Sequence, residues 1–296
     1  MAFRHFDHPS GENHWNSESR PYAGNAHRKC GDRARWTIII PFLNEGQFIE
    51  RTLESVAAQT APLQVVLVDN GSTDDGIAIA LAACRRLRID HQLVREPRRG
   101  KARALAAGLE EVSTPYVATF DADTYYPETY LEAGEWLLTG PNCAAAQAYY
   151  AYPNWKAWRR EAASLKLAIV SWLLPGQCHN GGAGQVFRTG AVRSAGGFDP
   201  HRWSHILEDH EIIHRVSTLG TTACSRDFWC APARRERDQP SSRWTFLERV
   251  IYHLTPRRLQ SRYFYSFLAP RLEGRKTPMA VTQRRNSEAR LARCAD

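Results

Sequence analysis

The chain has 296 residues, 43% of them hydrophobic and 24% charged, which are ordinary values for a globular protein with a buried core. This length allows one large domain or two small ones. The net charge of +8 and the pI of about 9.3 favour anionic partners: nucleotide phosphates, nucleic acid or an anionic membrane surface. No apolar run approaches the roughly 20 residues that span a bilayer, so we expect no membrane-spanning helix.

The seven cysteines form no C-x-x-C pair, and their number is odd. This pattern predicts free thiols in a reducing compartment and argues against a zinc site. The first residues lack the apolar core of a signal peptide. We therefore expect a soluble, cytoplasmic protein, or one that is peripheral on the inner face of a membrane.

Strand and helix patterns begin after a polar leading segment. Residues 1–33 show no periodicity, which predicts a disordered or loosely attached segment. The run "TIIIPF" (37–42) is typical of a strand buried on both faces. "EGQFIERTLESVAAQ" (45–59) predicts an amphipathic helix, and "LQVVLVD" (63–69) predicts a second buried strand. The inward stripe of this helix is formed by Ile49, Leu53 and Val56.

The alternation continues as far as residue 120. A second helix is predicted at 74–87, a short strand at 91–96, a third helix at 101–112 and a fourth strand at 115–120. The inward residues of the second helix are Ile77, Leu81 and Cys84. Strands that alternate with helices through short connections predict an α/β fold, with a mainly parallel central sheet and helices on both faces.

The second half of the chain is less regular. The patterns predict a strand at 144–152 and a helix at 155–174, followed by a glycine-rich segment at 179–199. A helix with an acidic start is predicted at 205–220, and an extended segment at 221–232.

Polar residues follow three of the predicted strands. Asn44 and Glu45 come after the first, residues 69–73 after the second and residues 121–123 after the fourth. Ligands of open parallel sheets bind beyond the carboxyl ends of the strands. We therefore expect these side chains to converge on one binding site.

Asp121 and Asp123, in "YVATFDADTYY" (116–126), stand one position apart at a strand end. Both could reach a divalent cation, or one could hold the metal and the other a ribose hydroxyl. Mg²⁺ and Mn²⁺ prefer oxygen ligands and share their sites with phosphates. The alternative is a chance D-x-D in which Asp121 only caps a helix.

Two further loops carry groups suited to a nucleotide. In "VDNGSTDD" (68–75), Asp69 could bind a base or ribose while Gly71 permits a tight turn. The alternative is a loop in which Ser72, Thr73 or Asp74 caps the next helix. "RRGKARA" (98–104) places three cations at a helix start, where they suit a diphosphate, unless they are a solvated charge run.

These segments together resemble the family 2 inverting glycosyltransferases, which have a GT-A type nucleotide-sugar-binding fold. The resemblance covers roughly residues 36–225, and six motifs occur in the family's order. They are "IIIPFLNE", "VVLVDNGSTDD", "RRGKARALAAGL", "YVATFDADT", "GAGQVFRTGAVRSAGGFD" and "LEDHEIIHRVSTLG". Each motif is weak alone, but the ordered set is specific.

The resemblance implies a donor site and a metal. Residues that would bind the donor are Pro41, Asn44, Glu45, Asp69, Lys101 and Asp121, with Asp69 at the base and Lys101 near the phosphates. Asp123 would ligate Mn²⁺ or Mg²⁺. The favoured donor is a UDP-sugar, with GDP- and dTDP-sugars left open.

The resemblance also implies the acceptor side. Asp209 would be the general base, with Glu208 beside it, and Gly182 and Gly184 would let sugar and acceptor approach the backbone. The alternative for Asp209 is an acid that favours the helix dipole. His205 or His210 could supply a third metal ligand, although such histidines more often belong to the surface or the core.

Two departures from the family pattern affect the expected reaction. Ala104 or Ala107 stands where relatives often have Asn. In "QPSSRW" (239–244) Arg243 and Trp244 are kept for phosphate and sugar contact, but Gln239 lies one place early for the processive Gln-x-x-Arg-Trp motif. We expect transfer of a single hexosyl group with inversion, to a hydroxyl of a glycan, glycolipid or other acceptor, with a lipid-linked or cell-envelope glycan as the suggested class.

The expected organisation is a catalytic domain at 34–232, divided into a nucleotide-binding half (34–125) and an acceptor half (126–232). A basic aromatic helical extension at 233–276 and a flexible tail at 277–296 follow. The extension could lie on an anionic membrane or close the catalytic domain.

Rival functions remain at this point. A nucleotidylyltransferase, a dehydrogenase or a P-loop kinase would need more glycines than "PFLNEGQ" offers. A non-enzymatic nucleic-acid or membrane-surface binding module would leave the carboxylates unexplained. A homologue that binds nucleotide without turnover is the third alternative.

Overall fold

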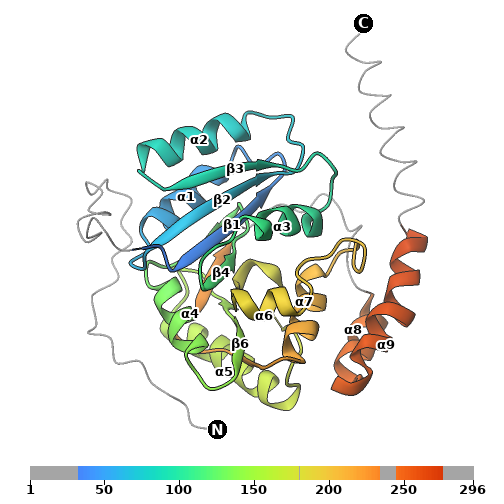
Figure 1. Ribbon diagram of the computed structural model, residues 1–296. Helices are drawn as coiled ribbons and strands as arrows, with labels where there is room; N and C mark the ends of the chain where they lie inside the picture. Colours follow the sequence, from blue (N-terminus) through green and yellow to red (C-terminus); the bar gives the residue numbers. More distant parts are fainter. Residues whose placement is uncertain (1–32, 180, 234–244, 276–296) are drawn as a thin grey trace, which may run out of the picture.

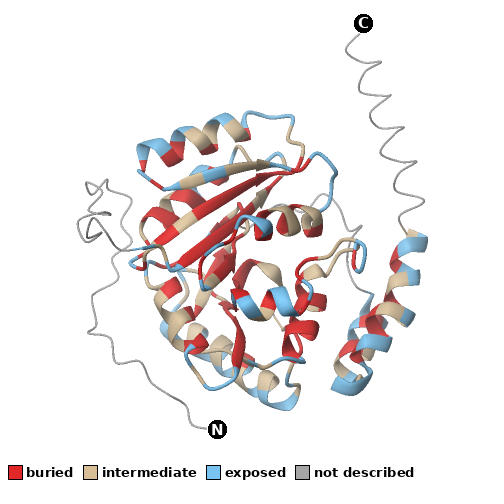
Figure 2. Cartoon of the chain, in the orientation of Figure 1, coloured by how far each residue is buried: buried red, intermediate tan, exposed pale blue. Residues whose placement is uncertain are grey.

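The computed structural model describes residues 33–179, 181–233 and 245–275. A seven-stranded sheet forms its centre, in the order β3-β2-β1-β4-β8-β6-β9, with helices on both faces (Figure 1). The central strands are buried, and the exposed positions lie mainly on the outer helices and the loops (Figure 2). The predicted α/β class and the two-sided covering of the sheet are confirmed.

The first half of the chain forms the parallel part of the sheet. Its strands pair in the order β3-β2-β1-β4. They are β1 (Trp36–Phe42), β2 (Leu63–Asp69), β3 (His91–Arg95) and β4 (Tyr116–Thr119). The helices between them are α1 (Ile49–Ala57), α2 (Gly76–Arg86) and α3 (Lys101–Glu110). The predicted strands and helices of this half are therefore confirmed, with α1 beginning four residues later than expected.

The β-branched run of β1 faces both layers of helices. Ile38 and Ile40 belong to one core cluster with Leu53 of α1, whereas Ile39 packs in the other cluster with Leu105 of α3. Helix α3 lies so close to the sheet at Gly108 that a Cβ there would stand 2.5 Å from the Ile39 side chain. Alternating burial on two faces explains why the strand has no polar side.

The second half makes the sheet mixed. β8 (Gln185–Arg188) pairs antiparallel with β4 and with β6 (Cys143–Gln147), and β9 (Thr221–Ala223) adds parallel to β6. A small sheet joins β5 (Thr124–Tyr125), β10 (Trp229–Pro232) and β7 (Tyr149–Tyr150). The sequence analysis did not predict the short β5, α4 (Tyr130–Leu138), or the elements inside the glycine-rich segment, which include β8 and α6 (Thr189–Ser194).

The remaining helices surround the second half. They are α5 (Ala157–Leu173), η1 (Gly182–Gly184), α7 (Glu208–Ser217), α8 (Phe246–Leu254), η2 (Arg257–Leu259), α9 (Gln260–Arg262) and the π-helical η3 (Tyr263–Leu268). The described C-terminal helices form a separate small core with Trp203. No helix in the described ranges combines the length and the apolar character needed to cross a bilayer. Where they are described, the cysteines are free thiols: Cys84, Cys143, Cys178, Cys224 and Cys230.

Candidate functional site

A cavity of about 310 Å³ opens at the carboxyl ends of β1 and β4. It brings together five of the residues predicted for the donor and metal site: Pro41, Glu45, Lys101, Asp121 and Asp123. Carboxylates and a lysine share this cavity because parallel strands end at the same edge of the sheet, where ligands usually bind. The predicted convergence is thus observed for these five residues.

Lys101 contacts carboxylates from two distant parts of the chain, Asp121 after β4 and Glu208 at the start of α7. Its Nζ lies 2.5 Å from Asp121 Oδ1 and 3.6 Å from Glu208 Oε1. Burial alone would lower the pKa of Lys101, but the carboxylates of Asp121 and Glu208 outweigh it and raise that pKa above its ordinary value. Lys101 therefore stays protonated and offers a fixed positive charge beside the cavity.

Tyr126, which the sequence analysis did not single out, fixes the loop that carries Asp121. The Asp121 backbone N–H donates to the Tyr126 hydroxyl (2.9 Å), and that hydroxyl donates to the Ala183 carbonyl (2.7 Å). The ring is fully buried and stacks on Phe120 with centroids 3.5 Å apart. Tyr126 thus holds the acidic strand end against the glycine-rich segment.

Asn70, which lies in the 69–73 range expected to converge on the site, has a similar positioning role that the sequence did not predict. Its side-chain amide donates to the carbonyls of Glu96 and Arg98, both at 2.9 Å, and its Oδ1 accepts from Gly100 N at 2.7 Å. These bonds join the loops after β2 and β3 to the start of α3. Asn70 lines the cavity and positions Lys101, the first residue of that helix.

Asn44 and Asp69 take part in the same loops without being among the residues that line the cavity. Asn44 has a left-handed φ of 56°, and its Oδ1 accepts from Thr73 N at 2.7 Å. Asp69 is buried and accepts from Ser72 N at 3.0 Å. Asp74 accepts from Gly76 N and Gly46 N and so stabilises the start of α2, in line with the alternative in which this loop caps the helix. A contact of Asp69 with a nucleotide base stays a prediction.

Asp209 lies at the start of α7, outside the lining of the cavity and near Lys101. Its Oδ1 accepts from the backbone N of His210 and lies 2.9 Å from the Nδ1 of that ring. Burial would raise the pKa of Asp209, but the charge and hydrogen bonds of His210 hold it below its ordinary value. Burial would likewise lower the pKa of His210, yet Asp209 keeps it well above its ordinary value. The two side chains form a buried ion pair.

The pKa of Glu208, beside Asp209, is shifted in the opposite direction. Burial raises its pKa to about 6, against the lowering effect of Lys101. The preceding residue, Leu207, has a left-handed φ of 70°, a costly conformation for a leucine. This strained turn directs Glu208 and Asp209 from the first turn of α7 toward the site.

The two glycines predicted for this side have different surroundings. A Cβ on Gly182 would stand 3.3 Å from Lys101 Nζ and 3.1 Å from Asp209 Cβ. A Cβ on Gly184 would instead stand 2.8 Å from Ala148 Cβ, in the core. Gly182 therefore lies between the lysine and Asp209, whereas Gly184 permits close packing of the small sheet.

Among the described residues, two arrangements offer ligand atoms for a metal. The cavity presents the carboxylates of Asp121 and Asp123, an oxygen set that suits a hard cation such as Mg²⁺ or Mn²⁺. Cys178, Asp209 and His210 have ligand atoms within 4.8 Å of one another. In this second group the His210 ring already pairs with Asp209, whereas the two carboxylates of the cavity are the hard oxygen donors that Mg²⁺ and Mn²⁺ prefer.

Other predicted residues lie away from this centre or outside the described ranges. His205 faces Glu273, with 3.6 Å between Nδ1 and Oε2, and its ring meets Trp203 edge-on. Arg98 pairs with Glu96. Arg243 and Trp244 fall within 234–244, which the structure does not describe.

Residues 37–194, more than half of the chain, match the model of the family described as Glycosyl transferase family 2. Glycosyltransferase AglE from Haloferax volcanii is 30% identical over 123 residues, which are 40% of this chain and 40% of that protein. The succinoglycan biosynthesis protein ExoA from Rhizobium meliloti is 29% identical over 203 residues, or 62% of this chain and 58% of ExoA. The matches thus span between two fifths and three fifths of the length of these relatives.

A solved structure has the same fold. The mannosyltransferase PcManGT from Pyrobaculum calidifontis, in complex with GDP-Man and Mn²⁺, superposes with a TM-score of 0.62 at 20% identity. The superposition covers 88% of this chain and 81% of that one. At this level of identity the likeness concerns the fold.

Proposed function

Because the chain belongs to glycosyl transferase family 2, we propose that it is a metal-dependent, inverting glycosyltransferase that moves a single hexosyl group from a nucleotide-sugar to a hydroxyl acceptor. The observation that carries this proposal is the meeting of Asp121, Asp123 and Lys101 in one cavity, with Asp209 outside its lining but close to Lys101 at Gly182. This arrangement separates cationic and metal-binding groups from a carboxylate base, as the reaction requires.

The donor side suits a nucleoside diphosphate. Asp123 would hold Mn²⁺ or Mg²⁺ and Asp121 the ribose region, while Pro41 and Glu45 line the wall of the cavity. The divalent ion, when bound, would neutralise charge on the departing diphosphate. Lys101 adds a permanent positive charge at the helix start, where phosphates are favourably bound. A UDP-sugar is the first donor to test, and GDP-mannose follows because PcManGT binds GDP-Man with Mn²⁺.

The acceptor side supplies a base. Asp209 is held ionised by His210, so it can take the proton of an acceptor hydroxyl as the oxygen attacks the anomeric carbon. The new C–O bond forms while the bond to the diphosphate breaks, and the nucleoside diphosphate leaves. A single displacement of this kind inverts the anomeric configuration, which proton NMR of the first product would report.

The acceptor itself is proposed from chemistry and relatives together. Gly182 leaves the space between Lys101 and Asp209 without a side chain, which suits the approach of a sugar or acceptor hydroxyl. ExoA is named for succinoglycan biosynthesis. We infer a lipid-linked or cell-envelope glycan as the acceptor, with the catalytic domain at 34–232 containing the whole reaction centre. The binding-module alternative leaves the ordered carboxylate set without a role.

Nucleotide binding that depends on a metal is the first expected result. One of UDP, GDP, dTDP, CDP and ADP should stabilise the protein in the presence of Mn²⁺ and much less in its absence. At a concentration about 100 times Kd the gain should be about 2.7 kcal/mol. Each kcal/mol raises Tm by about 2–4 °C in a domain of this size. Asp123→Ala should abolish the metal-dependent part of the shift.

A matched control for that experiment is Asp90→Ala. Asp90 is exposed and directly precedes β3, so it lies at the opposite end of the strands from the cavity. Its loss should leave the nucleotide shift unchanged. A metal-dependent nucleotide shift that persists in Asp123→Ala would contradict the proposed donor site. The same conclusion would follow if no nucleotide changed Tm but RNA did so in a salt-sensitive way.

The pH dependence of kcat/KM should report the Asp209–His210 pair. Asp209 acts only when ionised, and His210 lowers its pKa, so the acidic limb should lie below the ordinary range of an aspartate. In His210→Gln burial acts without the opposing charge, and the limb should move to higher pH by about one to three units. The exposed His201 provides the control His201→Gln. An unmoved limb in His210→Gln would show that Asp209 is not the titrating base.

A further inference from the structure

Helix α5 carries an apolar stripe that faces solvent. Trp158, Leu165, Ile169 and Trp172 recur at the spacing of one helical face, and Leu173 adjoins them. Their exposed fractions are 61%, 54%, 48%, 67% and 60%. Only Leu167 of this helix is buried. Large exposed apolar side chains gathered on one helical face usually mark an interaction site.

The charged residues next to this stripe are almost all cationic. Lys156, Arg159 and Lys166 are exposed. Glu161 is the one acidic residue of α5, and Arg226 pairs with it at 2.9 Å. The stripe is therefore flanked by unneutralised positive charge, on a chain whose net charge is +8.

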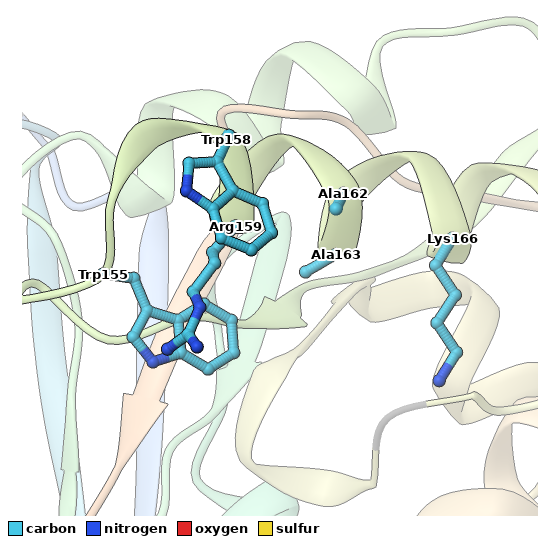
Figure 3. A pocket seen from close by; sticks show the side chains of 6 residues that line it. All are labelled: Trp155, Trp158, Arg159, Ala162, Ala163 and Lys166. Atoms are coloured by element: carbon cyan, nitrogen blue, oxygen red, sulfur yellow. The ribbon is translucent and has the colours of Figure 1, made fainter.

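A shallow cavity of about 320 Å³ lies over the first half of the helix. Trp155, Trp158 and Arg159 gather at one end of it, and Lys166 reaches over the other end (Figure 3). The Arg159 guanidinium lies 5.4 Å from the centroid of the Trp158 ring. Indole rings beside basic groups are the side chains that favour the boundary between lipid headgroups and acyl chains.

We propose that α5 lies in the plane of an anionic lipid bilayer, with the Trp158–Trp172 stripe in the headgroup and acyl boundary and Lys156, Arg159 and Lys166 on the lipid phosphates. The cationic residues that flank the stripe favour a bilayer over a protein as the partner that covers α5. The cores of protein interfaces are depleted in lysine, whereas an amphipathic helix with aromatic and basic residues binds anionic membranes.

The loop after α5 contacts α8. Gln177 of this loop donates to the Tyr252 carbonyl of α8 at 3.1 Å. In Figure 1, α5 lies at the bottom of the molecule and α8 at its lower right. Near this junction Leu254 is 76% exposed and is followed by Arg257 and Arg258. The described part of the basic extension, for which membrane binding and closure of the domain were both open, packs with Trp203 in a small core and exposes Arg257 and Arg258 to solvent.

The test uses the full chain and sedimentation with vesicles. Vesicles of phosphatidylcholine and phosphatidylglycerol in equal amounts should bind the protein, and vesicles of phosphatidylcholine alone should bind it weakly. Trp158→Ala/Trp172→Ala should reduce the partition coefficient by at least about tenfold. Each of Arg159→Gln and Lys166→Gln should reduce it about fivefold, with a loss that high salt also produces.

The variants are chosen so that folding and transfer activity remain separate questions. Both tryptophans are largely exposed, so the melting temperature and any nucleotide-dependent stabilisation should be unchanged. Leu219→Ala removes an equally exposed apolar residue outside α5 and should bind vesicles as the parent does. Equal binding by the tryptophan variant would overturn the proposal. Vesicle binding that does not depend on phosphatidylglycerol would also overturn it. A dimer in solution that the tryptophan variant abolishes would do the same.

Discussion

Replacing Asp209 with Asn is expected to lower kcat by about 10²–10⁴-fold, the usual contribution of a general base. Asn keeps the size of the side chain but cannot accept the proton of the acceptor hydroxyl. The donor cavity is lined by other residues, so nucleotide binding and its metal dependence should be retained. Steady-state kinetics with donor and acceptor, alongside nucleotide thermal shifts, would measure both properties on one preparation.

Glu208 is the competing base, and its pKa of about 6 makes it intrinsically the more basic of the two. Its carboxylate, however, lies 3.6 Å from Lys101 Nζ. The Oδ1 atom of Asp209 pairs with His210. Its Oδ2 atom faces the glycine-rich segment, where a Cβ on Gly181 would stand only 3.2 Å away and where Gly182 also lacks a side chain. Position therefore favours Asp209 although basicity favours Glu208.

The matched variant Glu208→Gln separates these roles. It should affect the charge balance around Lys101 and leave a larger part of kcat than Asp209→Asn does. An acidic limb near pH 6 that disappears in Glu208→Gln, with near-normal kcat in Asp209→Asn, would reverse the assignment. Loss of nucleotide binding in Asp209→Asn would mean that the substitution disturbs the donor cavity as well.

The parallel half of the fold could be predicted because β1, β2 and β4 are mainly apolar runs and a clear helix precedes each following strand, including the short and more polar β3. β1 and β2 illustrate this, since their residues from 36 to 42 and from 63 to 69 pair in register. The second half offered weaker signals. β8 has only four residues, and they lie within a glycine-rich segment. In α4 the buried position 134 is a glycine, since a Cβ there would stand 3.2 Å from the Val186 side chain, and this glycine interrupts the apolar pattern of the helix.

The candidate site could be predicted for residues that carry charge at strand ends, such as Asp121, Asp123 and Lys101. The residues that position them could not. Tyr126 and Asn70 act through bonds to backbone groups 57 and 30 residues away in the sequence. No local pattern encodes such a contact, and polar residues near a motif are too common to select without the fold.

Replacing Glu211 with Leu is expected to destabilise the protein by about 3–5 kcal/mol, because it leaves a buried guanidinium without its counter-ion. Glu211 is 1% exposed, and its two carboxylate oxygens each accept from Arg215 at 2.7 Å. Arg215 also donates to the Ala195 carbonyl, and the Tyr265 hydroxyl donates to Glu211. The network therefore joins α7 to the loop after α6 and to the C-terminal helices. Chemical denaturation would measure the loss.

The double variant Glu211→Leu/Arg215→Met tests whether the cost is the unpaired charge. Apolar residues of similar size often replace a buried ion pair without loss, so the double variant should be more stable than Glu211→Leu alone. Arg86→Ala is the control, since its ion pairs with Glu50 and Glu54 are exposed and should contribute no more than about 1 kcal/mol. A double variant as unstable as the sum of its parts would assign the loss to packing. Since Glu208 and Asp209 occupy the first turn of this helix, the same network keeps the proposed base in place.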